Sequence, residues 1–508
     1  MLLAAQTVLG FGAYLTIGVI LSIFIILLTT RLPIEMVFLG GSVILLATGT
    51  MPVQSVLSGF SAPVVVTVGA LFVVTAGLES TGFLKLAMLR FFGRPRSIVR
   101  ALLRMIVNVS VLSAFMSNTL VVSMLTPAVK SWARMLGIAP SKLLIPLSYS
   151  SCVGGMCLLI GTPANLVISE FYVSKTQQSL NMFAPFVPGV CMVALGAVLM
   201  VVLNRLLPSR KTAEDSLPEL ARSYSFKVPR GNHLVGMTLG DADVPIDDGR
   251  IRLTGIIRFD GEMCGSPCAD DFIMGGDTLY FSGSRRHAVA VARRSGLDIP
   301  ETMATVGRVR VNRKMMIAMT VFAAMVIASA FFSVPLVTCG LVAAFAMGLF
   351  GCCTITVAKK AVNWDILMVF AGSVVLGKAV DQTGIASVIA GQLLDWCGSS
   401  PRLALLLMCL VALLMTEFVS NTACGAVMAP IAAQIAIGCG ASPLPFFVGL
   451  MVSCSSSFMT PIGSPTHLIV FSPGGYRFSD FLRLGVPMSI LSLLVATLIV
   501  PLIFPFAP

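Results

Sequence analysis

The sequence predicts an all-α polytopic membrane protein with a small α/β domain in its middle, and three observations support that prediction. First, the 508 residues are 56% hydrophobic and only 11% charged, whereas soluble domains carry roughly 25% charged residues. Second, runs without any charged residue recur, and each reaches or approaches the ~20 apolar residues that cross a bilayer as a helix. These runs are residues 11–30, 143–159, 182–204, 315–350 and 484–508. Third, the composition changes abruptly at residue 208 and changes back at residue 314.

The segment 208–314 is polar and basic, and it contains short alternating runs such as GRIRLTGIIRFDG and DTLYFSG. Such runs, bounded by Gly and Asp turns, are typical of strands. We therefore expect a soluble α/β domain with its core at residues 222–297, flanked by linkers. This domain divides the membrane part into residues 1–207 and 315–508.

The two membrane parts carry matching landmarks. The triplet Ser-Asn-Thr occurs at residues 117–119 and again at 420–422. A Gly-Thr-Pro or Gly-Ser-Pro break follows, with Gly161 43 residues after Asn118 and Gly463 42 residues after Asn421. We interpret the two parts as an internal repeat. Each copy has five spans and one polar re-entrant hairpin, near residues 105–127 in the first copy and 403–430 in the second.

The basic residues predict that the two copies have opposite orientations. The first hairpin region, residues 85–142, carries nine Lys and Arg, whereas the equivalent region 381–442 carries only Arg402. Because cytoplasmic segments carry the excess of Lys and Arg, the first region is expected inside and the second outside, with the soluble domain in the cytoplasm. The same clustering between spans explains the net charge of +12 without a nucleic-acid partner. An inverted repeat is typical of secondary transporters, whose binding sites lie near the bilayer midplane.

The polar breaks indicate where such a site would lie. Interrupted helices occur at membrane depth only where protein or a water-filled cavity satisfies the backbone. Helix amino termini there favour an anion, and loose carbonyl groups favour a cation. The candidate residues for binding an anion are Ser117, Asn118, Thr119, Thr162, Ser420, Asn421, Thr422 and Ser464.

A second symmetry indicates cation sites. Five residues before each Asn of the triplets stands a hydroxyl residue, Ser113 in the first copy and Thr416 in the second. A hard cation such as sodium takes hydroxyl, amide and carbonyl oxygens. The two candidate sodium sets are Ser113, Asn118 and Gly161, and Thr416, Asn421 and Gly463. The competing interpretation is that small polar residues only pack helices together; the matched set favours function.

These motifs resemble a known family. The two triplets, IGTPANLVI at 160–168 and PIGSPTHLIV at 461–470, resemble the divalent anion/sodium symporters, which include sodium-sulfate and sodium-dicarboxylate cotransporters. The resemblance implies a homodimer of scaffold and transport domains, an elevator-type movement, and co-transported sodium ions. It also implies that the triplets and the Gly breaks contact substrate and sodium.

The soluble segment resembles a TrkA carboxy-terminal domain, through GNHLVGMTLG at 231–240 and MGGDTLYFSG at 274–283. Family members with such inserts often carry two copies, and this chain has one. Two roles stay open: a regulatory or dimer-stabilising module that binds a small ligand, and a passive spacer.

Three further residues are candidate modulators. The family pattern Pro-Pro-Asn reads Pro-Ala-Asn with Asn165 here, and Pro-Thr-His with His467. His467 either makes transport pH-dependent, because imidazole titrates near pH ~6.5, or donates one hydrogen bond as Asn would. Ionisable residues inside a membrane are functional candidates by default. Glu417 could shape a cation site, carry a proton, or pair with Lys378 or Arg402.

Together with the inverted repeat, the family resemblance implies sodium-coupled symport of a small divalent oxyanion in the cell (inner or plasma) membrane. The resemblance to members with TrkA-type inserts puts sulfate first and four-carbon dicarboxylates second, and the residues themselves do not discriminate between the two. A cation/proton antiporter would need carboxylates at the helix crossing, and only Glu417 is near. An anion channel gated by the soluble domain is the other alternative. An enzyme is not indicated, since the sequence has no nucleophile–base set, HExxH or P-loop.

Overall fold

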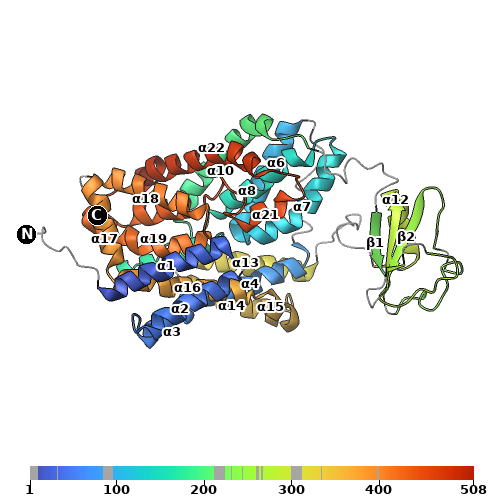
Figure 1. Ribbon diagram of the computed structural model, residues 1–508, viewed down its shortest axis with the longest axis horizontal. Coiled ribbons are helices and arrows are strands. Elements are labelled where there is room, and N and C mark those ends of the chain that lie inside the picture. Colours follow the sequence, from blue (N-terminus) through green and yellow to red (C-terminus); the bar gives the residue numbers. More distant parts are fainter. Residues whose placement is uncertain are drawn as a thin grey trace, which may run out of the picture. The chain divides into compact units, whose positions relative to one another are not determined.

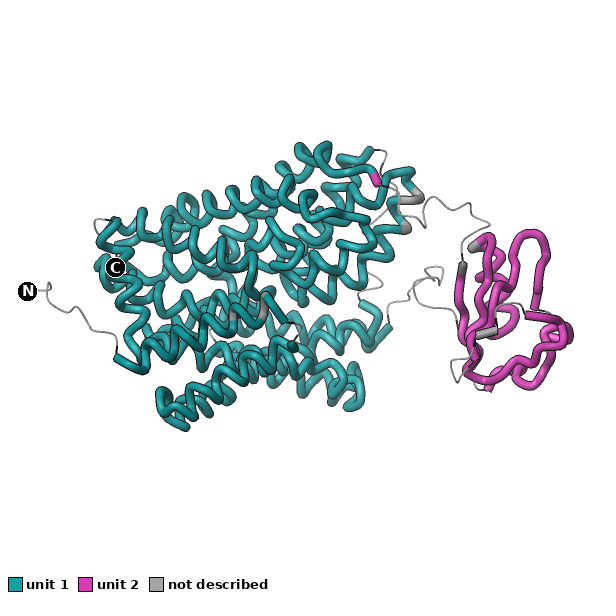
Figure 2. Tube along the Cα trace, in the orientation of Figure 1, with its two compact units in different colours: residues 1–209, 310–508 teal, residues 210–309 magenta. Residues whose placement is uncertain are grey.

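The computed structural model describes residues 10–30, 32–83, 95, 97–210, 223–229, 231–242, 244–258, 263–264, 267–298, 312–332, 334–397 and 400–507. The chain forms two compact units, which are described separately (Figure 2). The first unit comprises residues 1–209 and 310–508, and the second comprises residues 210–309.

The first unit is helical, and its apolar sequence explains why. Its helices before residue 210 are α1 (Phe11–Thr29), α2 (Ile34–Ala47), α3 (Val53–Phe60), α4 (Pro63–Ser80), α6 (Ile98–Phe115), α7 (Asn118–Met135), η1 (Pro140–Lys142), α8 (Leu144–Gly155), α9 (Pro163–Thr176), α10 (Phe186–Leu203) and η2 (Asn204–Leu206). Those after residue 310 are α13 (Arg313–Phe331), α14 (Leu336–Leu349), α15 (Ile355–Ala361), α16 (Trp364–Gln382), α17 (Ile385–Cys397), α18 (Pro401–Thr416), α19 (Asn421–Gly438), α20 (Leu444–Cys454), α21 (Pro465–Phe471), α22 (Phe478–Leu494), the π-helical segment η4 (Val495–Ile499) and α23 (Val500–Ile503).

Among the described residues, six helices are long and apolar enough to cross a membrane, and a seventh is added if α15 and α16, bent by 48°, count as one span. Two of the six, α6 and α19, belong to the predicted hairpins. Several segments expected as spans are instead shorter helices, such as α2 and α20. The polar breaks separate α8 from α9 and α20 from α21. Each of these helices is therefore too short to be identified as a membrane span by its length alone. The chain is a multi-pass helical membrane protein.

The two parts of this unit pack through the same pairs of elements. Helix α6 packs against α8 just as α18 packs against α20, and α10 and α22 each lie against their own pair. Contacts between the parts are also reciprocal, because α9 packs against α19 and α21 packs against α7; α21 and α7 are labelled side by side in Figure 1. Pro163 and Pro465 start α9 and α21, which is the helix position where a missing N–H costs least.

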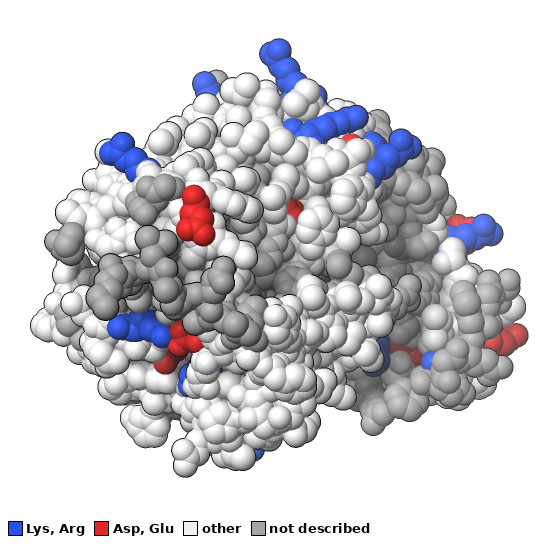
Figure 3. All heavy atoms as spheres, turned by 60° about the vertical axis from the view of Figure 1, so that its left-hand side comes forward, with Lys and Arg blue, Asp and Glu red and all other residues white. Residues whose placement is uncertain are grey.

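The surface of the protein is mostly uncharged on the face drawn in Figure 3, where Lys, Arg, Asp and Glu are sparse. Large apolar side chains are exposed along α13 and α14, among them Phe331, Phe332, Phe345 and Leu349. A lipid environment accommodates such side chains, whereas a soluble protein rarely exposes a large contiguous apolar patch.

The second unit is an α/β fold. Its strands β1 (Ser223–Lys227), β2 (Ile251–Ile257), β3 (Met263–Cys264) and β4 (Thr278–Gly283) form one antiparallel sheet in the order β1-β4-β2-β3. Helix α12 (Arg285–Arg294) packs against β4 and β1. The two alternating runs of the sequence form β2 and β4, and their inward residues Ile256, Leu279 and Phe281 lie in the core with Phe226.

Candidate functional site

The first triplet lies where α6 ends and α7 begins. Ser113 Oγ, in the last turn of α6, donates a hydrogen bond to Asn118 Oδ1 at 2.6 Å. Ser113 also contacts Ser151 Oγ at 2.8 Å, and Ser151 Oγ donates to the Asn118 carbonyl at 3.2 Å. Ser117 and Asn118 are half-buried, whereas Thr119 is exposed. The hydroxyl groups of α6 and α8 therefore fix the amide side chain at the start of α7.

The second triplet repeats this arrangement between α18 and α19. Thr416 Oγ1 lies 2.9 Å from Asn421 Oδ1 and 2.7 Å from the Cys454 carbonyl. Ser457 Oγ donates to Asn421 Oδ1 at 3.3 Å. Ser420 Oγ caps α19 by accepting from the Ala423 N–H at 3.3 Å. A short polar side chain at this position stabilises a helix start, which explains why the triplet ends one helix and begins another.

The two Asn side chains are held in the same way, and their amide nitrogens are available. In both, the side-chain oxygen accepts from the hydroxyl five residues earlier. Because an amide oxygen only accepts, the Nδ2 group must be the donor. Among the described residues, neither Asn118 Nδ2 nor Asn421 Nδ2 donates a hydrogen bond. Thr422 is buried beside the second amide.

The glycine breaks pack close to the segments that carry the triplets. A methyl group on Gly161 would lie 2.3 Å from the Gly155 carbonyl oxygen, and one on Gly155 would lie 2.6 Å from Asn118 Oδ1. A methyl group on Gly463 would lie 2.8 Å from Ser457 Cβ and 3.3 Å from the Thr416 and Glu417 carbonyl oxygens. In the second half the break therefore lies directly against the carbonyl groups at the end of α18, whereas in the first half Gly161 lies against Gly155, which in turn lies against Asn118. Approaches this close are compatible only with glycine.

The two halves meet through reciprocal contacts at these breaks. Thr162 Oγ1, from the first half, lies 3.3 Å from Ser455 Oγ of the second half. Ser464 Oγ, from the second half, lies 3.9 Å from Cys152 Sγ of the first half. Cys152 follows Ser151, which contacts Ser113, and Ser455 follows Cys454, whose carbonyl accepts from Thr416. A continuous polar cluster thus joins the two halves.

Glu417 is buried, with 1% of its surface exposed, and its carboxylate is held by backbone groups. Oε1 accepts from the Met459 N–H and Oε2 from the Thr460 N–H, each at 2.8 Å. Lys378 Nζ instead donates to Ser58 Oγ at 2.8 Å, so the pairing with Lys378 considered from the sequence is not observed. Two backbone dipoles take the place of a basic partner, and they tie Glu417 to the loop that leads to Gly463.

His467 and Asn165 occupy equivalent positions but have different partners. His467 Nε2 lies 2.7 Å from the Ser457 carbonyl and Nδ1 lies 2.7 Å from Ser148 Oγ. Because a carbonyl only accepts, Nε2 carries the proton. Asn165 Nδ2 donates to the Leu158 carbonyl at 3.2 Å, while Asn165 Oδ1 is buried and accepts no hydrogen bond within the described part of the chain.

The sequence reasoning missed the residues that connect the predicted ones. These are Ser148, Ser151, Cys152, Ser455 and Ser457 on α8 and on the segment that follows α20. The signal was present, since the runs SYSSC at 148–152 and SCSSS at 453–457 stand at nearly matching positions in the two halves.

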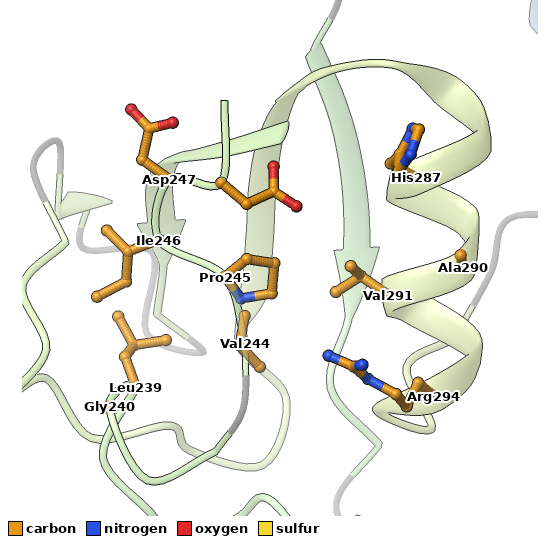
Figure 4. Close-up of a pocket in the computed structure, with 11 residues that line it drawn as sticks. Leu239, Gly240, Val244, Pro245, Ile246, Asp247, His287, Ala290, Val291 and Arg294 are labelled. Atoms are coloured by element: carbon orange, nitrogen blue, oxygen red, sulfur yellow. The ribbon is translucent and has the colours of Figure 1, made fainter. Parts of the chain in front are cut away.

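The second unit contains a separate cavity of about 630 Å³ between the loop 239–248 and helix α12 (Figure 4). Val244, Pro245 and Val291 give it apolar walls, and Arg294 reaches toward it from α12. Asp248 forms one turn at its edge. Burial opposes ionisation of this carboxyl, but the N–H groups of Arg250 and Ile251, at 2.8 and 2.7 Å from Oδ1, outweigh that effect and hold its pKa below the usual range.

Comparison with known families identifies two matching profiles. The profile described as "Citrate transporter" matches residues 24–393. The profile described as "Sodium:sulfate symporter transmembrane region" matches residues 298–504. Between them, the two profiles span both halves of the helical unit.

Individual relatives agree with these matches. An uncharacterised transporter of Synechocystis sp. is 27% identical over 603 aligned residues, covering 97% of this chain and 97% of that protein. Sodium/sulfate cotransporter 1 of Chlamydomonas reinhardtii is 34% identical over 254 residues, covering 48% of this chain and 28% of that protein. Na(+)/dicarboxylate cotransporter 3 of Rattus norvegicus is 34% identical over 141 residues, covering 28% of this chain and 24% of that protein.

A solved structure shares the fold. The YdaH transporter of Alcanivorax borkumensis superposes with a TM-score of 0.53 at 13% sequence identity, covering 97% of this chain and 100% of that chain. The matches and the helical architecture together describe a membrane transporter and not an enzyme.

Proposed function

The chain belongs to the divalent anion/sodium symporter family, and from that premise we propose that it couples the inward movement of sodium ions to the uptake of a small divalent oxyanion, with sulfate as the first candidate. The observation that carries the proposal is the reciprocal polar cluster. Two hydroxyl–Asn pairs, one from each half, are joined by the contacts Thr162–Ser455 and Ser464–Cys152.

The cation sites follow from the oxygens at each break. In the first half Ser113 is hydrogen-bonded to Asn118, and Gly161 packs against Gly155. In the second half Thr416 is hydrogen-bonded to Asn421, and Gly463 packs against Ser457. Each set offers hydroxyl, amide and carbonyl oxygens, the ligands that a hard cation takes. The hydroxyl hydrogens can rotate away when sodium arrives, because a hydroxyl both donates and accepts.

The anion would be held by donors without a formal charge. The proposed donors are the Nδ2 groups of Asn118 and Asn421 and the amino-terminal N–H groups of α7 and α19, one set from each half. The remaining proposed contacts come from Ser117, Thr119, Thr162, Ser420, Thr422 and Ser464. Since helix amino termini favour negative charge, and bound sodium ions add positive charge, no Arg side chain is required.

The finer architecture is part of the same proposal. The reciprocal packing of α9 on α19 and α21 on α7 supports an inverted repeat of five spans and one hairpin per half. The excess of basic residues in the first hairpin region supports a cytoplasmic soluble domain. A homodimer moving by an elevator-type mechanism is what the family resemblance implies.

Coupling to sodium supplies the driving force for accumulation. One net positive charge that moves inward across 100 mV contributes ~2.3 kcal/mol. Because ~1.4 kcal/mol is a tenfold change in an equilibrium, one such charge supports an accumulation of roughly forty-fold.

The test is uptake of labelled sulfate by proteoliposomes that contain the purified protein, with an inward sodium gradient or with choline. We expect sodium-dependent accumulation above equilibrium. Equal uptake in choline would exclude sodium coupling, and uptake that stops at equilibrium would favour a channel.

A four-carbon dicarboxylate is the second candidate. The citrate-transporter profile, which matches residues 24–393, and the similarity to a Na(+)/dicarboxylate cotransporter favour it. Sulfate stays first because the sodium/sulfate cotransporter covers 48% of the chain and the dicarboxylate cotransporter covers 28%. Competition decides between the two: succinate that inhibits labelled sulfate uptake at lower concentrations than unlabelled sulfate would reverse the order.

A further inference from the structure

A second cavity, lined by ionisable side chains, lies in the helical unit and contains none of the triplet residues. It has a volume of about 320 Å³ between α3, α9 and α16, and we call it the α3–α9–α16 cavity. Four ionisable side chains line it, two acidic and two basic: Glu170, Lys175, Lys378 and Asp381. Its other polar lining residues are Ser55, Ser58, Ser174 and Gln382. Nothing in the proposed anion and sodium sites uses these groups.

The cavity shares a helix with the proposed binding site. Helix α9 begins at Pro163, directly after Thr162, and Lys175 stands twelve residues further on, which is about 18 Å along a helix. The sequence-based orientation puts the region 381–442 outside, so Asp381 and its ion-pair partner Lys175 are expected toward the outer surface, with Lys378 near the end of a span. The cavity is therefore placed on the external side of the polar cluster, at the far end of α9.

Helix α16 connects the cavity to the helix that carries the second triplet. A methyl group on Gly377 would lie 2.2 Å from Phe171 Cζ and 2.7 Å from the Ala426 carbonyl oxygen, so α16 contacts both α9 and α19 at this point. Phe171 also lines the cavity. Ala426 is five residues after Asn421 in α19, about 7.5 Å along the helix. The Phe171 ring and a short stretch of α19 separate the two places.

The charged groups are held by contacts that are easily exchanged. Lys175 Nζ lies 2.6 and 2.9 Å from the Asp381 carboxylate oxygens, with the two side chains 33% and 24% exposed. Lys378 Nζ donates to a hydroxyl, Ser58 Oγ, and Glu170 lines the same cavity without an ion-pair partner among the described residues. Because a quarter to a third of each side chain remains exposed, solutes can reach the pair, and an arriving ion can compete for either partner.

We propose that the α3–α9–α16 cavity is an external capture site for the coupled ions, in which Lys175 and Lys378 take the divalent oxyanion and Glu170 and Asp381 take sodium. The inference rests on the proposed symport function. A cavity that balances two carboxylates against two ammonium groups suits a solute that arrives as a dianion with its counter-cations. Charged clefts raise the local concentration of ions of opposite sign. The Phe171 side chain, which lines the cavity, would then separate the capture site from the proposed binding site.

The lysine variants Lys175→Gln and Lys378→Gln test the anion part. In proteoliposomes we expect the KM for labelled sulfate, and for labelled succinate, to rise about three- to tenfold while the maximal rate stays unchanged, because steering is lost and the binding site is intact. The effect should shrink at high ionic strength, where such fields are screened. Arg402→Gln is the matched control, since Arg402 is exposed and does not line the cavity.

The acidic variants Glu170→Gln and Asp381→Asn test the sodium part. We expect the half-saturating sodium concentration to rise about three- to tenfold and the anion KM to stay within about twofold. A purely structural ion pair makes the opposite prediction, because Lys175→Gln and Asp381→Asn then break the same bond and act alike. Matching shifts in the two variants, or no shift in any of the four, would overturn the proposal.

A measurement without transport separates this inference from the proposed function. Purified protein is treated with an amine-acylating reagent, and modification of Lys175 and Lys378 is followed by mass spectrometry. We expect sulfate and succinate to slow acylation of both lysines relative to chloride at the same ionic strength, with Arg402→Gln behaving as the parent does. If neither sulfate nor succinate slows acylation of the two lysines, the capture site is excluded, even if sodium-dependent uptake is observed. Protection without sodium-dependent uptake would exclude the proposed function instead.

Discussion

At the scale of single residues, both halves of the polar cluster contain the same contact, in which a hydroxyl group donates a hydrogen bond to the side chain of an Asn five residues later. Ser113 with Asn118 and Thr416 with Asn421 are equivalent pairs, at 2.6 and 2.9 Å. The hydroxyl fixes the amide orientation and leaves the nitrogen without a hydrogen-bond partner among the described residues, so that it can donate to a ligand. Each pair thus holds a proposed anion donor, the Asn nitrogen, and offers oxygens to a proposed sodium ion. We therefore expect substitutions in a pair to change the binding of both the anion and sodium.

Replacement of the Asn residues tests this contact. Asn118→Ala and Asn421→Ala should each reduce sodium-dependent uptake at least tenfold, since each removes a proposed anion donor and a cation ligand together. Ser113→Ala should mainly raise the half-saturating sodium concentration, because it removes one oxygen and leaves the amide nitrogen. Ser123→Ala, on the exposed face of α7, is the control. Uptake that survives both Asn variants would place the binding site elsewhere.

The glycines behind the triplets allow a second test at this scale. Gly155→Ala would place a methyl group 2.6 Å from Asn118 Oδ1, which forces the amide to move, and overpacking of this kind typically costs ~1–3 kcal/mol. We expect uptake to be lost while the protein still purifies as a folded species. Gly391→Ala, in α17 where the added methyl group meets nothing within 4 Å, should leave uptake unchanged. The comparison is made by size-exclusion chromatography, thermal unfolding and sulfate uptake.

At the scale of elements, the second half contains a brace that the first half lacks. Glu417 follows α18 and binds the N–H groups of Met459 and Thr460, and Thr460 Oγ1 in turn donates to the Glu417 carbonyl and accepts from Gly463 N–H. The corresponding residue of the first half is Ala114. The loop before α21 is therefore tied to the end of α18, whereas the loop before α9 has no such carboxylate.

Glu417→Gln should loosen that loop. The amide group offers only one acceptor atom where the carboxylate offered two, so one buried N–H group is left unpaired, at a cost of about 1–3 kcal/mol. We expect a lower unfolding temperature and a higher half-saturating sodium concentration, since Gly463 lies at the end of this chain of hydrogen bonds. Asp395→Asn, which changes an exposed carboxylate on α17, serves as the comparison. An unfolding temperature equal to that of the parent protein would show that the brace does not contribute.

At the scale of the whole molecule, local patterns could be predicted from the sequence and contacts between distant segments could not. Polar triplets inside apolar runs predicted where α6 and α18 end, and alternating residues predicted β2 and β4. The lengths of α2, α8 and α20 differ from full spans because breaks and turns shorten them. The backbone partners of Glu417 and the Ser148–His467 contact, 319 residues apart in sequence, depend on how the halves pack, which no single segment encodes.

An inverted repeat must expose equivalent points of its two halves on opposite sides of the membrane, and this can be tested by labelling. Ala139 and Ala441 follow α7 and α19 at nearly equivalent positions, and the excess of Lys and Arg predicts that the first lies inside and the second outside. In a background with Cys268→Ser, Ala441→Cys should react with an impermeant maleimide on intact cells, whereas Ala139→Cys should react only after permeabilisation. Cys268 is exposed in the second unit, so in the unmodified protein it should also require permeabilisation. If both engineered cysteines react from the same side, the repeat is not inverted, and the two polar breaks would approach the cluster from one face of the membrane.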